Sequence, residues 1–139
     1  MIVDANVVVS AALGRSLPLV LAIADRDETL LIPEQQMREA RLVTATQVER
    51  RGHDPHAAFA WAEALLLEVP TELYEGYEIE ARTRLGRGGQ KDWPLLALAL
   101  ASGDEVWSND VDLFGTGIVV WTTRNITRAR QPMLTDAEL

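Results

Sequence analysis

The sequence contains no cysteine and only two histidines. The absence of cysteine excludes disulfides, thiolate nucleophiles and cysteine-based zinc sites. His53 and His56 flank an expected helix start at Asp54 and Pro55, and they lack the third ligand that a zinc site needs. Long apolar runs are also missing, because stretches such as Leu95 to Ala101 are too short to span a bilayer.

Positive charge is scarce, with 13 basic residues against 21 acidic ones and a formal net charge of −8. This balance argues against a passive nucleic-acid binder, whose affinity comes from basic groups on phosphates. It remains compatible with an enzyme that contacts phosphates through bound metal ions, or with a basic partner protein. The first residues, with an acid at Asp4 and no basic start, do not resemble a secretory signal, so we expect a cytoplasmic protein.

Short apolar strands alternate with helices along a chain whose length suits one domain, residues 1–139. We expect strands at 1–3, 29–33, 105–108 and 117–121, and helices at 6–13, 17–26, 34–50, 56–68, 71–85 and 91–102. This alternation predicts an α/β fold, a three-layer α/β/α arrangement with a central parallel β-sheet. Ligands bind such sheets at the carboxyl ends of the strands.

Acidic residues follow two of the expected strands. Asp4 comes directly after the first, and "VWSNDVDLF" places Asp110 and Asp112 just past a later one. The apolar pair Leu113 and Phe114 closes that phrase, so we expect the acids to lie between two buried elements. Carboxylates this close raise each other's pKa values unless a cation or hydrogen bonds offset the repulsion.

Two further acids are candidates on helices. Asp92 stands at the start of the most apolar helix, as a plain N-cap or, because Pro94 disfavours helical geometry at the preceding residue, one position before an N-cap at Trp93. Glu39 could project from a partly buried helix face, with Glu34 as its competitor; the alternative is a solvated glutamate.

The remaining acids of this region, Asp104 and Glu105, have the pattern of ordinary surface residues between a helix and a strand. Carboxylates gathered without histidine or cysteine form an all-oxygen site suited to Mg²⁺ or Mn²⁺. A water molecule activated there could attack a phosphodiester.

These segments resemble a known family. "MIVDANVVVSA", the helix around Glu39, "KDWPLLALALASGDEVWSNDVDLF" and the strand after it are similar to a PIN domain, the nuclease fold of the VapC toxins of bacterial toxin–antitoxin pairs. The resemblance implies catalytic acids, metal ligands and two supporting residues. The catalytic acids are Asp4, Glu39, Asp92 and Asp110; the metal ligands are Asp4, Asp92, Asp110 and Asp112; the supporting residues are Asn6 and Ser108, the latter hydrogen-bonding within the acidic cluster.

The resemblance also implies a Mg²⁺- or Mn²⁺-dependent ribonuclease, a homodimer, and an antitoxin whose tail enters the acidic site, often with an arginine. Basic residues could flank the site and bind RNA phosphates, or form a solvated basic surface. They are Arg82, Arg84, Arg87, Lys91, Arg124, Arg128 and Arg130. We interpret "GRGGQ", residues 86–90, as a flexible hinge between two helices.

Two other functions stay open. A receiver-like domain would phosphorylate one aspartate of an acidic Mg²⁺ pocket, but it needs paired acids after its first strand and a lysine after a late one. Here the first strand offers only Asp4, and Lys91 precedes a helix. The other alternative is a PIN fold that serves only as a binding module.

Overall fold

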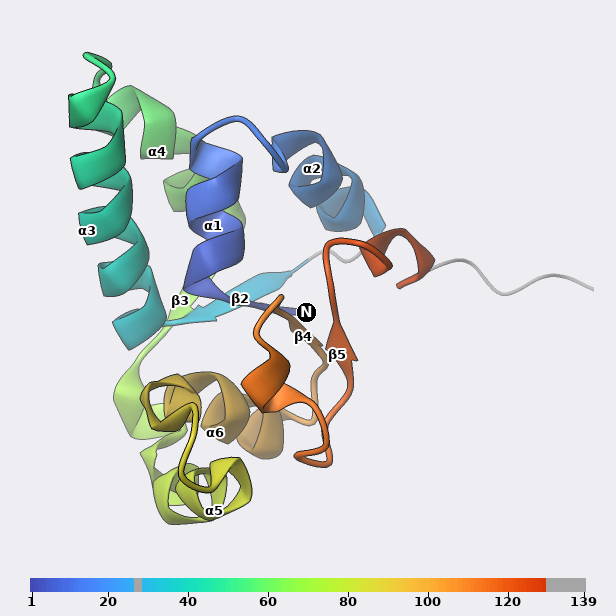
Figure 1. Ribbon diagram of the computed structural model, residues 1–139. Helices are drawn as coiled ribbons and strands as arrows, with labels where there is room; N and C mark the ends of the chain where they lie inside the picture. Colours follow the sequence, from blue (N-terminus) through green and yellow to red (C-terminus); the bar gives the residue numbers. More distant parts are fainter. Residues whose placement is uncertain (27–28, 130–139) are drawn as a thin grey trace, which may run out of the picture.

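The computed structural model describes residues 1–26 and 29–129, which fold around a parallel sheet (Figure 1). The order of its five strands is β3-β2-β1-β4-β5. The strands are β1 (Ile2–Val3), β2 (Leu30–Pro33), β3 (Leu66–Val69), β4 (Val106–Trp107) and β5 (Val120–Trp121). The helices are α1 (Ala5–Ala12), α2 (Leu17–Arg26), α3 (Glu34–Arg50), α4 (Pro55–Leu65), α5 (Glu78–Leu85) and α6 (Trp93–Ser102).

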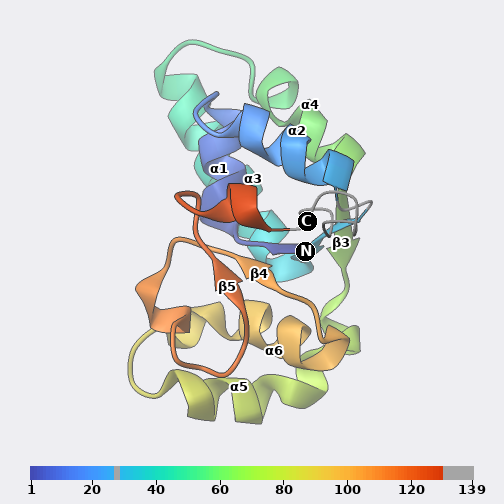
Figure 2. The same ribbon diagram turned by 90° about the vertical axis from the view of Figure 1, so that its right-hand side faces the viewer.

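Helices cover both faces of the sheet. Figures 1 and 2 show α1 to α4 on one side and α5 with α6 on the other. Successive residues of a strand point to opposite faces, so each strand supplies both layers. Val3 and Trp107 join the apolar cluster under α1 to α4, whereas Ile2 and Val106 join the cluster under α5 and α6. The predicted three-layer α/β/α fold is confirmed.

The third strand was not predicted. We expected a helix over 56–68, but α4 ends at Leu65, and β3 pairs with β2 along its whole length, from Leu30 opposite Leu66 to Pro33 opposite Val69. A short apolar run can form either element, and here the pairing with β2 decides. The helix expected over 71–85 is also wrong in its first half, where two short 3-10 turns precede α5.

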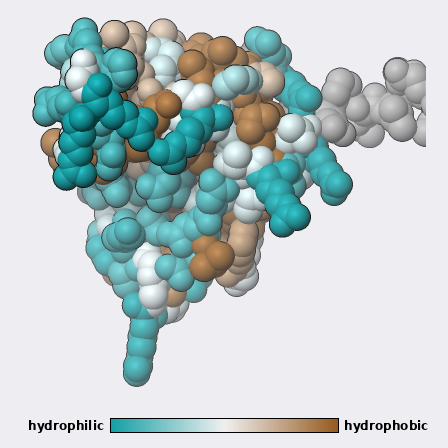
Figure 3. Space-filling model, turned by 45° about the horizontal axis from the view of Figure 1, so that its top comes forward, coloured by the Kyte–Doolittle hydropathy of each residue, from teal (hydrophilic) through white to brown (hydrophobic). Residues whose placement is uncertain are grey.

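No single helix among residues 1–26 and 29–129 is long and apolar enough to cross a membrane; α1 and α2 pass that test only as a pair, which bends by 120°. The face in Figure 3 is largely hydrophilic, and apolar side chains interrupt it in separate patches.

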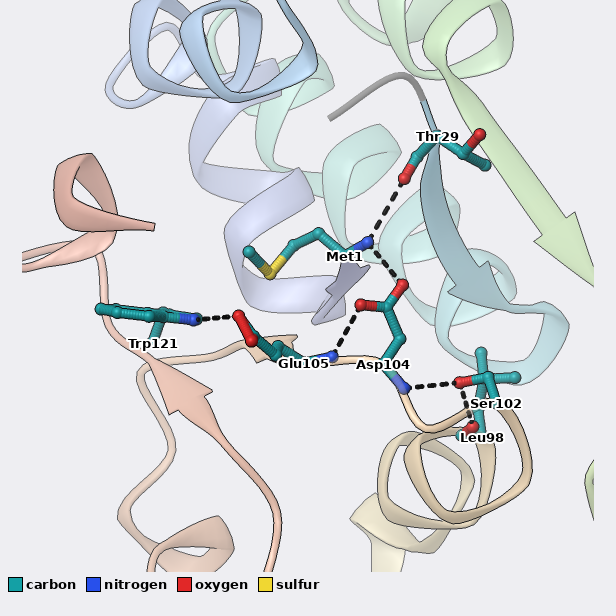
Figure 4. Close-up of polar contacts among 7 residues, drawn as sticks. All are labelled: Met1, Thr29, Leu98, Ser102, Asp104, Glu105 and Trp121. Carbon is teal, nitrogen blue, oxygen red and sulfur yellow. Dashed lines mark hydrogen bonds and ion pairs between the residues drawn. The ribbon is translucent and has the colours of Figure 1, made fainter. Parts of the chain in front are cut away.

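At the amino ends of β1 and β4, acidic side chains are paired (Figure 4). The terminal ammonium of Met1 donates to Asp104 Oδ2 at 2.7 Å, and Trp121 Nε1 donates to Glu105 Oε1 at 2.8 Å. The interpretation of Asp104 and Glu105 as ordinary surface acids is therefore wrong. Both are half-buried and hold the start of the sheet together.

Candidate active site

Asp4 leaves β1 at the carboxyl edge of the sheet and is almost completely buried, with 3% of its surface exposed. Its backbone N–H donates to the carbonyl of Trp107 at 3.0 Å, which ties it to the end of β4. The side chain caps α1, because Oδ1 accepts the N–H of Asn6 at 3.1 Å. Asn6 acts through its backbone, since its own side chain is exposed.

Ser108 joins the two acids that follow β1 and β4. Its fully buried hydroxyl donates to Asp4 Oδ2 at 2.5 Å and accepts the backbone N–H of Asp110 at 3.0 Å. Asp110 Oδ1 in turn accepts the N–H of Asp112 at 2.9 Å. The hydrogen-bond chain therefore runs from the end of β1 through Ser108 into the acidic turn.

Asp92 reaches the same edge from the other layer. It is the N-cap residue of α6, yet its side chain makes no capping hydrogen bond, so the plain N-cap interpretation fails. Trp93 is helical, with φ −53° and ψ −34°, and Pro94 fits because a first-turn residue needs no N–H partner. The Asp92 carboxyl lies close enough to Asp110 for a shared proton, while its buried Oδ2 has no hydrogen-bond partner within the described chain.

The carboxyls perturb one another. Burial, followed by the hydrogen bond to Asp110 and the charges of Asp110 and Asp4, raises the pKa of Asp92 to about 8. The hydrogen bond from Asp92 lowers the pKa of Asp110 from its ordinary value. Burial raises the pKa of Asp4 despite the opposing hydrogen bonds from Ser108 and Asn6. Without a cation, Asp92 and Asp110 therefore hold one proton between them near neutral pH.

The two candidate glutamates of α3 have different environments. Glu34 Oε1 accepts the backbone N–H of Thr71 at 2.9 Å and also the Thr71 hydroxyl, and these bonds lower its pKa. Glu39 is exposed rather than on the partly buried face we expected, but its charge raises the pKa of Asp4. Glu39 is thus the helix acid within electrostatic range of the carboxyl edge, while Glu34 is engaged elsewhere.

Asp112 lies at the exposed rim against the glycine-rich segment. A Cβ on Gly89 would lie 2.6 Å from Asp112 Cβ, and one on Gly88 would lie 3.5 Å from Asp112 Oδ1. Of the apolar pair that follows, Leu113 is buried but Phe114 is 48% exposed, so the acids do not lie between two buried elements. They face solvent on this side.

Sequence reasoning missed two supports of the site. The buried Gln36 side chain accepts the N–H of Ala5 at 2.9 Å and so fixes the turn after Asp4. Asn109 and Thr123 bond each other twice, at 2.8 and 2.9 Å, which fixes the turn between Ser108 and Asp110. Both contacts join residues distant in sequence, and no local pattern announces them.

The donor set suits a hard divalent cation, because every candidate ligand is a carboxylate oxygen and Asp92 Oδ2 is buried without a partner. The side chains are not arranged as a closed shell: within the described chain no three His, Cys, Asp or Glu residues are grouped closely enough to hold an ion. Asp4, Asp92 and Asp110 nevertheless interact electrostatically, since the charge of Asp110 raises the pKa of both Asp4 and Asp92.

In a comparison with known protein families, the family model for the PIN domain matches residues 2–131. Neither the curated proteins nor the solved structures contain a match to this chain.

Proposed function

Because the chain belongs to the PIN domain family, whose members are generally nucleases that bind RNA, we propose that it is a metal-dependent endoribonuclease. The observation that carries this proposal is the buried, unpartnered Oδ2 of Asp92 beside the carboxyls of Asp110 and Asp4. A fold retains such a costly group where a ligand satisfies it. The proposed unit is one domain, residues 1–139.

Asp4, Asp92 and Asp110, assisted by Asp112, would hold Mg²⁺ or Mn²⁺, which when bound supplies the positive charge that polarises a phosphodiester and activates water. Ser108 orients the Asp4 carboxyl and the backbone of Asp110 through its two hydrogen bonds. The proton shared by Asp92 and Asp110 has to leave before both carboxylates can bind a cation. Glu39 faces the solvent from which the hydrolytic water comes.

The finer assignment is a VapC-like toxin of a type II toxin–antitoxin pair, acting as a cytoplasmic homodimer. An edge of uncompensated carboxylates suits an inhibitor segment that carries a cation, because such a segment would replace the metal charge. Mixing the protein with a basic antitoxin peptide should abolish cleavage, and size-exclusion chromatography with light scattering should give a dimer. Cleavage unaffected by the protein of a neighbouring small gene would contradict the toxin assignment.

The decisive test is cleavage of RNA by purified protein with Mg²⁺ or Mn²⁺, beside EDTA and beside Asp110→Asn. We expect cleavage that EDTA abolishes and that the variant reduces by at least about 100-fold. The Asn side chain keeps the oxygen that accepts the Asp112 N–H, so the fold should survive. Divalent ions that bind without any cleavage would favour the non-catalytic binding module, and no metal binding at all would rule out the proposal.

A further inference from the structure

The acidic edge poses a problem for an RNA substrate, because the carboxylates and the net charge of −8 repel phosphates. An enzyme of this charge needs local cations that bind the RNA backbone beside the site. Residues 82–91, which join α5 to the start of α6, carry four basic side chains. The structure separates these four into two classes.

Two of the four cations are already engaged. Arg84 donates to Glu80 at 2.7 Å and to the carbonyl of Thr116 at 2.9 Å. Arg82 donates to Gln90 at 3.3 Å and lies over the ring of Trp93, 5.5 Å from its centroid. These contacts neutralise or fix their charges, so both arginines serve the packing of α5.

The other two cations, Arg87 and Lys91, are exposed and make no hydrogen bond or ion pair with any residue that the structure describes. Lys91 lies one residue before Asp92, and its charge lowers the pKa of both Asp92 and Asp110. A free ammonium therefore lies within electrostatic range of the proposed catalytic carboxyls. Arg87 precedes Gly88, the first of the two glycines at which an added Cβ would meet Asp112.

The segment that carries them, which we interpreted as a flexible hinge, is connected to α5 by hydrogen bonds. Gln90 Nε2 donates to the carbonyl of Arg82 at 2.8 Å and also to that of Gly86, and Asp92 N–H donates to Gly89 at 2.9 Å. Gly89, with φ +69°, lets the backbone pass closer to Asp112 than any side chain allows. The free cations thus lie on a hydrogen-bonded loop whose backbone passes close to Asp112 at the acidic rim.

We propose that Arg87 and Lys91, the phosphate strip of this enzyme, bind the RNA phosphates next to the scissile one and set the position of the strand over the carboxyl edge. The proposal rests on the ribonuclease function above. Phosphate contacts of this kind position a nucleic acid without reading its sequence. Arg82 and Arg84 take no part in this binding.

The test removes both cations of the phosphate strip and compares the effect with that of removing two cations from a distant part of the surface. The double variant Arg87→Gln with Lys91→Gln is paired with Arg50→Gln with Arg51→Gln. The latter two are exposed at the far end of α3, a helix roughly 26 Å long whose first turn holds the Asp4 segment through Gln36. Both double variants have the same net charge, so a general field effect would be equal in the two.

Binding is measured with a fluorescein-labelled single-stranded RNA and Asp110→Asn protein in Mg²⁺, by anisotropy over a range of KCl concentrations. We expect the strip variant to bind at least about ten-fold more weakly, with the slope of log Kd against log salt reduced by about 1.4. In otherwise active protein, removal of the phosphate strip should mainly raise KM and change kcat little. The control pair should change Kd less than about two-fold.

Equal weakening in both double variants, or no change in the strip variant, would overturn the strip while leaving the nuclease intact. Absence of RNA binding and of cleavage in the unmodified protein would instead overturn the ribonuclease function, and the strip with it. Cleavage with an unaltered KM in the strip variant overturns the strip alone.

Discussion

Acidic side chains lie in opposite environments at the two ends of β1 and β4. At the amino ends of β1 and β4, Asp104 bonds the Met1 ammonium and Glu105 bonds Trp121, so each carboxylate has a donor. At the carboxyl ends, Asp92 faces Asp110 and leaves an oxygen buried without a partner in the described chain. Paired acids stabilise a fold, whereas acids that face one another without a donor oppose it.

The largest effect should come from replacing one acid at each end of the sheet by asparagine, in two separate variants. Asp92→Asn should reduce metal-dependent RNA cleavage by at least about 100-fold while leaving stability equal or higher, because it removes a repelling charge. Asp104→Asn should leave cleavage unchanged and cost about 1–2 kcal/mol, because it weakens the bond to Met1. Cleavage rates and urea unfolding at pH 8 measure both. Two variants with the same profile would abolish the distinction between the ends.

Removing the serine that connects the carboxyl end should cost both function and stability. Ser108→Ala leaves Asp4 Oδ2 and the Asp110 N–H without their buried partner, at an expected cost of about 1–3 kcal/mol. Metal affinity, followed by calorimetric titration with Mn²⁺, should fall about 10–100-fold. Ser108→Thr keeps the hydroxyl and should restore most of the affinity. An alanine variant with wild-type affinity would show that the hydrogen-bond chain is not needed.

Gly89 at the acidic rim can be compared with Gly103, a glycine of the same backbone conformation that lies away from other side chains. Gly89 and Gly103 share the left-handed conformation, with φ and ψ of 69° and 15° against 72° and 10°. A Cβ at Gly103 meets nothing within 4 Å, whereas one at Gly89 meets Asp112 at 2.6 Å. Gly103→Ala should lose about 1 kcal/mol because of its left-handed backbone, and Gly89→Ala should lose more because its Cβ must also displace Asp112. Only Gly89→Ala should also lose several-fold in cleavage rate. Equal rates in the two would place Asp112 outside the reaction.

The last comparison is the pH dependence of stability without metal. Asp92 has a pKa of about 8 in the folded protein and an ordinary value near 3.8 when unfolded. The folded state therefore keeps a proton that the unfolded state has released, so stability falls as pH rises from about 4 to about 8, by at most about 1.4 kcal/mol per unit. Urea unfolding in EDTA at pH 5 to 8 should show this decline, and Asp92→Asn should flatten it. Parallel curves would contradict the shared proton.

Local patterns were sufficient for most of the fold and for part of the site. The helices predicted at 17–26 and 34–50 match α2 and α3, and the alternation of elements implied the parallel sheet that brings Asp4 and Asp110 to one edge. Strand β3 was not predicted, because a short apolar run directly after a helix carries no local signal that distinguishes a strand from a helix. The roles of Asp4, Glu39, Asp92, Asp110 and Asp112 in catalysis or metal binding remain predictions.

What could not be predicted depends on contacts between distant segments. Gln36 looks like any helical glutamine until the sheet brings it to Ala5. The sequence left Glu34 and Glu39 as competing candidates for the helix acid of the site. The hydrogen bond from the Thr71 N–H to Glu34 distinguishes them. Arg130, one of the expected phosphate-binding residues, lies outside the described residues.

The bond between Ser108 and Asp4 spans 104 residues of sequence, and β1 takes its place between β2 and β4 only when β4 is available. During synthesis the first aspartate emerges almost at once, but its partners emerge only after most of the described helices. A growing chain therefore lacks the complete acidic edge until the segment from Ser108 to Asp112 has been synthesised.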